Sequence, residues 1–167
     1  DKPCFLELKK KYKSIVFKRR ISAPYTDIKS YMAGEDSGIE NSQILKEIDY
    51  FRRFYGCLKP AADIFYDREA FYDRTDSSVR LTFDSNALAR GWDLELENGI
   101  YGERVLENGL YILEVKTSGA MPMWIAEMLN EFKIYPISFS KYGTAYKNGL
   151  LTRENKKIIT LGGEYCA

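Results

Sequence analysis

The sequence predicts an α+β fold, in which antiparallel strands and separate helices share one domain. Several segments alternate apolar with charged residues, which is typical of strands. Two other stretches repeat apolar residues at helical spacing. The 167 residues, of which 45% are hydrophobic and 14% aromatic, are enough to bury a core.

A β-hairpin and two helices are expected first. The strands cover residues 4–10 and 14–22, on either side of a lysine-rich turn. A Pro-Tyr-Thr-Asp stretch then starts a short helix that ends near Gly34. A second helix begins at Asn41, and Gly56 ends it.

The rest of the chain is expected to hold three strands and two helices. Pro60 precedes a strand in "DIFYDREAFYD", and further strands follow in "VRLTFD" and in residues 110–117. Residues 86–108, rich in glycine and charge, are expected to form loops or short strands. Pro122 starts an amphipathic helix whose aromatic and methionine side chains should face the core. A last short helix follows Pro136.

Each predicted strand has one apolar and one charged face, because residues two apart point to the same side. Glu7 and Lys9, for example, lie opposite the leucines of their strand. Cations outnumber carboxylates on these faces, although the whole chain carries only +1. This excess indicates an anionic ligand. The cations are Lys9, Lys18, Arg20, Arg68, Arg80, Lys116 and the later Lys141, and the carboxylates are Glu7, Asp84 and Glu114.

The simplest alternative is a sheet whose charged face is solvated. Arg68 could then pair with Asp67 at the surface, and Glu114 with Lys116 or a neighbouring strand. Exposed ion pairs contribute only about 0–1 kcal/mol to the stability of the fold, and salt screens them. Closing the sheet into a barrel would instead gather the cations, which would then require a polyanion. Two glutamates among them suit a divalent metal bound jointly with phosphate.

Composition excludes several functional classes. The chain has no histidine, so histidine bases and histidine-bound transition metals are absent. Its three cysteines are far apart and form no CxxC motif, which indicates a reducing compartment and argues against zinc. The low net charge argues against nucleic acid as a partner. Neither a transmembrane run nor a signal-peptide pattern occurs. A cytoplasmic location is expected, with the cytoplasmic face of a membrane complex as an alternative.

Six runs of residues resemble the VTC domain (vacuolar transporter chaperone type), a branch of the triphosphate tunnel metalloenzymes. They occur in family order between Phe5 and Ala145: "FLELKKK", "VFKRR", "YDREAF", "VRLTFD", "LEVKTSGAMPMWI" and "FSKYGTA". The resemblance implies an antiparallel β-barrel tunnel lined by Lys, Arg and Glu, with helices packed outside. Residues 1–167 would form a single tunnel domain without its N-terminal part, since the family's Arg-x-Arg pair and a further lysine are not in this chain.

The resemblance also implies an enzyme, a polyphosphate polymerase that transfers phosphoryl groups from ATP to a growing polyphosphate chain with Mn or Mg. All seven cations named above would bind phosphate, with Arg20 preferred to Arg19 by strand register. Glu114 matches the family's metal-binding glutamate, and Glu7 is a second acidic position. Two alternatives stay open, a hydrolase of tripolyphosphate or nucleoside triphosphates and a non-catalytic polyphosphate-binding module. The candidate catalytic residues are Arg68, Arg80, Lys116 and Lys141.

Overall fold

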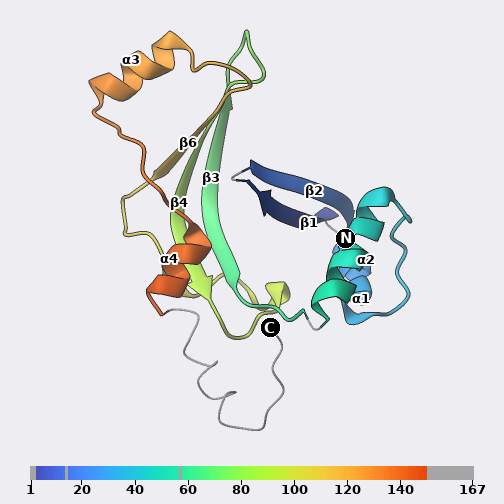
Figure 1. Cartoon of the computed structure of the whole chain (residues 1–167). Coiled ribbons are helices and arrows are strands. Elements are labelled where there is room, and N and C mark those ends of the chain that lie inside the picture. The colour runs from blue at the N-terminus through green and yellow to red at the C-terminus, as the bar shows by residue number, and fades with distance from the viewer. Residues whose placement is uncertain (1–2, 14, 57, 150–167) are drawn as a thin grey trace. The chain divides into compact units, whose positions relative to one another are not determined.

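The structure, a computed structural model, describes residues 3–13, 15–56 and 58–149. These residues divide into two compact units, the first up to Lys59 and the second from Pro60 onward, and each is described by itself (Figure 1). Within the described residues, antiparallel sheets and four α-helices confirm the expected α+β class. The single domain and the closed barrel stay predictions. In the described residues no helix combines the length and apolar character needed to cross a membrane.

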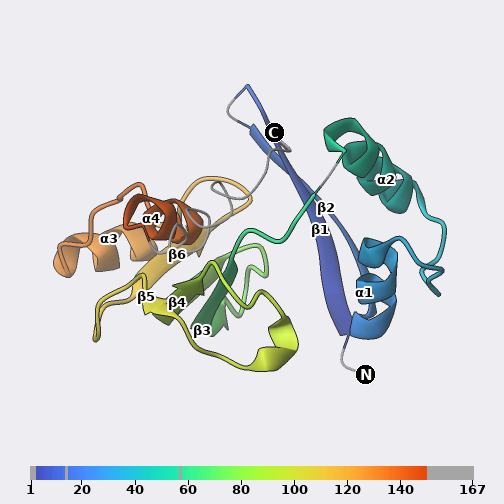
Figure 2. The same ribbon diagram turned by 90° about the horizontal axis from the view of Figure 1, so that it is seen from below.

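The first unit is a β-hairpin with two helices, as the sequence predicted. The apolar face of the hairpin packs on both helices, and Leu8, Tyr31, Leu45 and Ile48 form the buried core. Figure 2 shows the two long strands lying against each other. The elements are β1 (Pro3–Tyr12), β2 (Ile15–Pro24), α1 (Tyr25–Ala33) and α2 (Gln43–Tyr55).

Local signals explain where these two helices begin and end. α1 stops because Gly34 adopts the left-handed conformation with φ of 84°, which glycine accepts without strain. α2 begins where the Ser42 hydroxyl accepts a hydrogen bond from the Leu45 amide at 3.2 Å, and Gly56 follows its last residue. Arg52 joins the helices by donating to two backbone carbonyls at the end of α1. The predicted C-terminal ends at Gly34 and Gly56 are confirmed, whereas α2 begins at Gln43, two residues after the predicted Asn41.

The second unit is a four-stranded antiparallel sheet with two helices. β4 is its central strand, with β3 along one edge and both β5 and β6 along the other (Figure 2). The elements are β3 (Asp63–Tyr72), β4 (Arg80–Arg90), the 3-10 turn η1 (Leu96–Asn98), β5 (Glu103–Arg104), β6 (Ile112–Lys116), α3 (Met123–Glu131) and α4 (Lys141–Lys147).

β4 extends further than the sequence predicted. The interval 86–108 was expected to hold loops or short strands, yet β4 continues to Arg90. Its pairing with β3 shifts register between Phe65 and Asp67, where Asn86 has a positive φ of 49°. This β-bulge bends the strand without ending it. The glycine-rich remainder does contain loops and the short β5.

Two alanines explain why β4 continues after the bulge. Ala87 and Ala89 are fully buried and pack against Val105 and against Ala145 of α4. Alanine has a low intrinsic preference for strands, but burial against a helix outweighs that preference. Their small side chains allow α4 to lie close to the sheet.

α3 lies where predicted but turns a different side inward. Its fully buried residue is Ile125, whereas Trp124 and Phe132 are 44% and 66% exposed. The expectation that the aromatic side chains face the core was therefore wrong for these two residues. Helical spacing alone does not show which side of a helix meets the sheet when apolar residues surround it.

A buried arginine fixes the loop after β4. Arg90 is fully buried, and its Nε and Nη2 donate to Asp63 Oδ2 at 3.1 and 2.7 Å. Its remaining hydrogen bonds go to the backbone carbonyls of Gly99 and Glu95 at 2.9 and 3.0 Å. One side chain thereby ties the first residue of β3 to the loop that follows β4.

Candidate functional site

One cationic surface lies on the hairpin of the first unit, and we call it the hairpin face: Glu7, Lys9, Lys18 and Arg20. Glu7 lies opposite Arg20 and Lys9 opposite Lys18, so all four share the side that faces away from the helices. Glu7 pairs with Lys18 at 2.6 Å and with Lys9 at 3.4 Å. Partial burial raises the pKa of Glu7, but hydrogen bonds from the two lysines outweigh this and lower it.

The strand register separates two neighbouring arginines. Arg20 shares the hairpin face, and its guanidinium stacks over the ring of Phe5 at 4.5 Å. Arg19 points to the other side, where its Nη2 lies 3.5 Å from the Glu47 carboxylate of α2. The structure therefore agrees with the register that the sequence interpretation preferred.

A second cationic surface lies on the sheet of the second unit, and we call it the sheet face. Three cross-strand pairs define it, because residues directly opposite one another point to the same side. The first of these pairs joins β3 to β4, and the other two join β4 to β6. α4 adds a lysine at its first residue. The pairs are Arg68 with Asp84, Thr82 with Glu114 and Arg80 with Lys116, and the added lysine is Lys141.

Asp84 is the centre of the sheet face. Its carboxylate, only 3% exposed, accepts hydrogen bonds from Arg68 Nε and Nη2 at 2.6 and 2.7 Å. It also accepts one from Lys141 Nζ at 2.5 Å. Burial by itself raises the pKa of Asp84, but the donors of Arg68 and Lys141 lower it below its usual value. Arg68 thus pairs with Asp84, whereas Asp67, the partner considered in the sequence, binds Asn86.

Glu114 is the exposed carboxylate of the sheet face. Its side chain is 44% exposed, and it lies 3.1 Å from Lys116 Nζ and 3.9 Å from Arg68 Nη2. In the described part of the chain no three His, Cys, Asp or Glu side chains gather as a metal cluster. Mg²⁺ and Mn²⁺, however, are commonly held by one or two carboxylates together with substrate phosphates. Glu114 fits that second kind of site.

Arg80 and Thr82 carry hydrogen-bonding atoms that the described residues leave unused. Arg80 Nε and Thr82 Oγ1 are both buried, and neither has a hydrogen-bond partner there. The guanidinium of Arg80 lies 6.0 Å from the ring centre of Tyr72. Buried polar groups are nearly always paired. Both residues lie on β4 within the sheet face, Arg80 opposite Lys116 and Thr82 opposite Glu114.

The unpaired hydroxyl leads to a prediction for Thr82→Val. Valine removes a buried group that has no partner in the described residues, so the free energy of unfolding should stay level or rise by up to about 1 kcal/mol. Urea unfolding measures it. The control is Thr75→Val, because the Thr75 hydroxyl donates to Asp73 at 2.6 Å and its loss should not stabilise the protein. A clear loss of stability in Thr82→Val would show that its hydroxyl is paired.

The lowered pKa of Asp84 predicts a pH dependence. As pH falls, the unfolded chain takes up the proton first, at about pH 4. The stabilisation by the Asp84 carboxylate is therefore complete above that pH and is lost as pH falls through its lower folded value. Unfolding of the unsubstituted protein and of Asp84→Asn, compared from about pH 6 to 2.5, should show a stability difference that shrinks in acid. A difference that grows in acid would contradict the assignment.

Sequence reasoning found the cations but gave no role to Asp84. It counted this residue only in the charge balance of its strand. Alternation could place Arg68 and Asp84 on charged faces, yet only the pairing of β3 with β4 sets them opposite each other. Lys141 comes from α4, 57 residues further along the chain. The family resemblance grouped Lys141 with the strand cations, but it did not predict the contact of Lys141 with Asp84.

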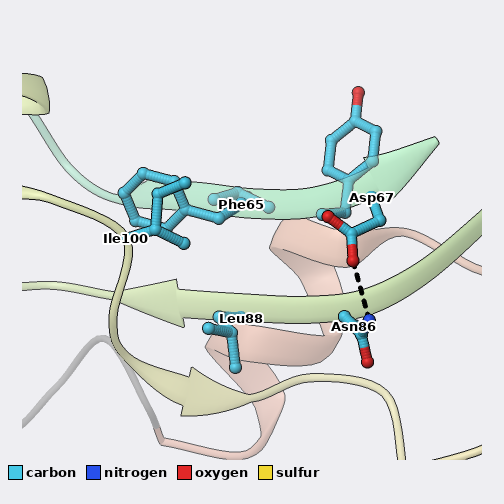
Figure 3. A pocket seen from close by; sticks show the side chains of 7 residues that line it. Phe65, Asp67, Asn86, Leu88 and Ile100 are labelled. Atoms are coloured by element: carbon cyan, nitrogen blue, oxygen red, sulfur yellow. Dashed lines mark hydrogen bonds between the residues drawn. The ribbon is translucent and has the colours of Figure 1, made fainter.

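A pocket near the β4 bulge contains none of the predicted site residues. It is mostly apolar, and the Asn86 amide donates to Asp67 Oδ2 at 2.7 Å within it (Figure 3). The described residues that line it include no lysine or arginine, so it offers no cation to attract phosphate. The side chains labelled in Figure 3 are Phe65, Asp67, Asn86, Leu88 and Ile100.

Comparison with known proteins gives one family. The family model described as VTC domain matches residues 1–149, which include both the hairpin face and the sheet face. Neither the curated proteins nor the solved structures contain a match to the chain.

Proposed function

Because the chain belongs to the VTC domain family, whose model matches residues 1–149, we propose that it acts as a polyphosphate polymerase. In this proposal it transfers phosphoryl groups from ATP to a growing polyphosphate chain. Family membership supports a polyphosphate-related function in general. The observation that carries the specific proposal is Arg80, a partly buried arginine whose Nε has no partner in the described residues, on a face with excess positive charge.

The charges of the sheet face suit a chain of phosphates. Four cations, Arg68, Arg80, Lys116 and Lys141, share it with two carboxylates, so two positive charges are in excess. Phosphoryl transfer requires mainly positioning and charge stabilisation from the protein. Arginine can bind phosphate through two parallel hydrogen bonds. On the hairpin face, Lys9, Lys18 and Arg20 would bind further phosphate groups by the same chemistry.

A divalent metal belongs to the proposal. Glu114 would hold Mn²⁺ or Mg²⁺ together with the phosphates, and Glu7 is the second acidic candidate. Such an ion, when bound, would neutralise negative charge on the phosphoryl oxygens. The protein's role is to hold Glu114 beside Lys116 on β6, next to Arg80 of β4.

The fold proposed for this activity is the antiparallel β-barrel tunnel that the family resemblance implies, with helices packed outside. The six described strands are all antiparallel, and in the first unit the helices pack on the side of the hairpin opposite its cations. In the second unit the first residue of α4, Lys141, lies on the same side of the sheet as Asp84. We propose that residues 1–167 act as one tunnel domain and that it works in the cytoplasm or at the cytoplasmic face of a membrane complex. A crystal structure with bound tripolyphosphate tests the tunnel.

Product analysis tests the activity. Purified full-length protein is incubated with ATP and Mn²⁺, and the products are separated on a gel stained for polyphosphate. Long phosphate chains are the expected result. Release of orthophosphate without long chains would instead support a hydrolase of triphosphates. Binding of polyphosphate without any turnover would support a non-catalytic binding module and overturn the enzyme proposal.

A further inference from the structure

We infer that Asp84 is a positioning residue, which holds Arg68 and Lys141 as a two-cation clamp for one phosphate group of a triphosphate or polyphosphate. This inference rests on the proposed function, because it needs a phosphate ligand on the sheet face. The clamp joins three elements, since Asp84 lies on β4, Arg68 on β3 and Lys141 on α4.

The geometry of Asp84 fixes both cations at once. Its two carboxylate oxygens receive three charge-assisted hydrogen bonds between 2.5 and 2.7 Å. The Arg68 and Lys141 side chains are 35% and 19% exposed, so they are restrained but still reachable. Long cationic side chains normally lose much rotamer freedom when they bind a ligand. Here that freedom is lost on folding, before any ligand arrives.

Asp84 leaves both cations able to bind phosphate. An arginine has five N–H donors and a lysine three. Arg68 donates through only two atoms to Asp84, and Lys141 forms one such bond. Several donors therefore remain on each cation. The cluster of two cations and one carboxylate also keeps one positive charge in excess, so it still attracts an anion.

Tyr66 restrains the same two cations from β3. Its ring centre lies 5.0 Å from the Arg68 guanidinium and 4.2 Å from Lys141 Nζ. Stacking of cations on an aromatic ring is favourable by about 0.5–1 kcal/mol at exposed sites. The two cations are thus oriented both by a carboxylate and by a ring.

The place of Lys141 in its helix agrees with this role. Lys141 is the first residue of α4, where the helix dipole disfavours a positive charge. Ala145 already attaches α4 to the sheet through Ala87 and Ala89. The lysine is therefore unfavourable for the helix itself, and its contact with Asp84 compensates for that position.

A second buried pair in the same sheet provides a matched control. Asp63 and Arg90 have the same chemistry, with side chains 9% and 0% exposed and bonds from Nε and Nη2 to the carboxylate. The other donors of Arg90 bind backbone carbonyls, and this arginine is fully buried. Asp63 therefore represents a buried carboxylate with a purely structural role.

The experiment measures the affinity of the full-length protein for inorganic tripolyphosphate by calorimetry, without metal, for the unsubstituted protein, Asp84→Asn and Asp63→Asn. We expect Asp84→Asn to bind about tenfold more weakly, because Arg68 and Lys141 lose their common anchor. Asp63→Asn should melt at a lower temperature and bind unchanged. If net charge alone decided affinity, Asp84→Asn would bind tripolyphosphate more tightly, because the substitution removes a negative charge beside the bound anion.

Two further variants show how Asp84 acts. Asp84→Glu keeps the charge but moves the carboxylate by one methylene, so tripolyphosphate binding should weaken without a change in net charge. This variant also replaces Asp84→Asn if Asp84→Asn fails to fold. In a Lys141→Ala background, Asp84→Asn should have a smaller effect on affinity than it has alone, because the two residues act as a unit.

Unchanged or tighter tripolyphosphate binding by folded Asp84→Asn or Asp84→Glu overturns the inference. So does an equal loss of affinity in Asp63→Asn. Tripolyphosphate binding without turnover of ATP overturns the proposed polymerase but leaves the clamp to be judged from the affinities. No binding by the unsubstituted protein overturns the clamp, whereas the polymerase is judged separately from the products formed with ATP and Mn²⁺.

Discussion

Replacement of Arg80 by alanine is expected to abolish the formation of long phosphate chains while the fold stays intact. No hydrogen bond to Arg80 Nε exists in the described residues, so its loss breaks no such bond there. Because Arg80 is partly buried and lies over the Tyr72 ring, alanine also removes some packing, so the free energy of unfolding should fall by about 1 kcal/mol. Loss of one donor that stabilises charge in a transition state costs about 10²–10³-fold in rate. The yield of polymer from ATP and Mn²⁺ tests the loss of activity. The melting temperature, measured on the same preparations, tests whether the fold is intact.

Two variants sharpen this test. Arg80→Lys keeps the charge but removes the planar guanidinium, and we expect it to recover only a small part of the activity. Arg104→Ala removes an exposed arginine from β5 of the same sheet and should leave the activity unchanged. Normal polymer formation by Arg80→Ala would remove this residue from the site. Equal losses in Arg80→Ala and Arg104→Ala would show that only the general charge of the sheet matters.

The sequence predicted the local structure well, because local chemistry determines it. Gly34 and Gly56, which the sequence predicted as the ends of the first two helices, directly follow the last residues of α1 and α2. Alternation also placed the cations correctly. Arg68 and Arg80, predicted on charged faces, do lie on one side of the sheet. Where the period of two is unbroken, the side to which each residue points follows directly.

The sequence could not predict what long-range packing decides. β4 continues beyond Asn86 because Ala87 and Ala89 are buried beneath α4, and that helix lies more than fifty residues away. The contact of Asp84 with Lys141 has the same origin. In each case a distant element outweighs the local preference, and alternation alone contains no information about which helix returns to the sheet.

Replacement of Arg90 by alanine is expected to be the most destabilising change in the second unit. It would leave the Asp63 carboxylate buried without its cation and two backbone carbonyls without a donor. Breaking a buried ion pair by removing one partner costs about 3–5 kcal/mol. For a protein of this size that lowers the melting temperature by roughly 10 °C. Thermal unfolding followed by circular dichroism measures the shift, with the exposed Arg104→Ala as the control that should melt normally.

The destabilisation caused by the unpaired charge of Asp63 can be separated from the other effects of losing Arg90. The double variant Asp63→Leu with Arg90→Met replaces the ion pair by apolar side chains and should recover much of the stability, because the uncompensated charge is removed. If the double variant is as unstable as Arg90→Ala, the bonds to the carbonyls of Gly99 and Glu95 are the main contribution instead. A normal melting temperature for Arg90→Ala would contradict both explanations. Arg90 lies on the same strand as Asp84. If Arg90→Ala lowers the melting temperature but leaves tripolyphosphate affinity unchanged, stability and phosphate binding depend on different residues of β4.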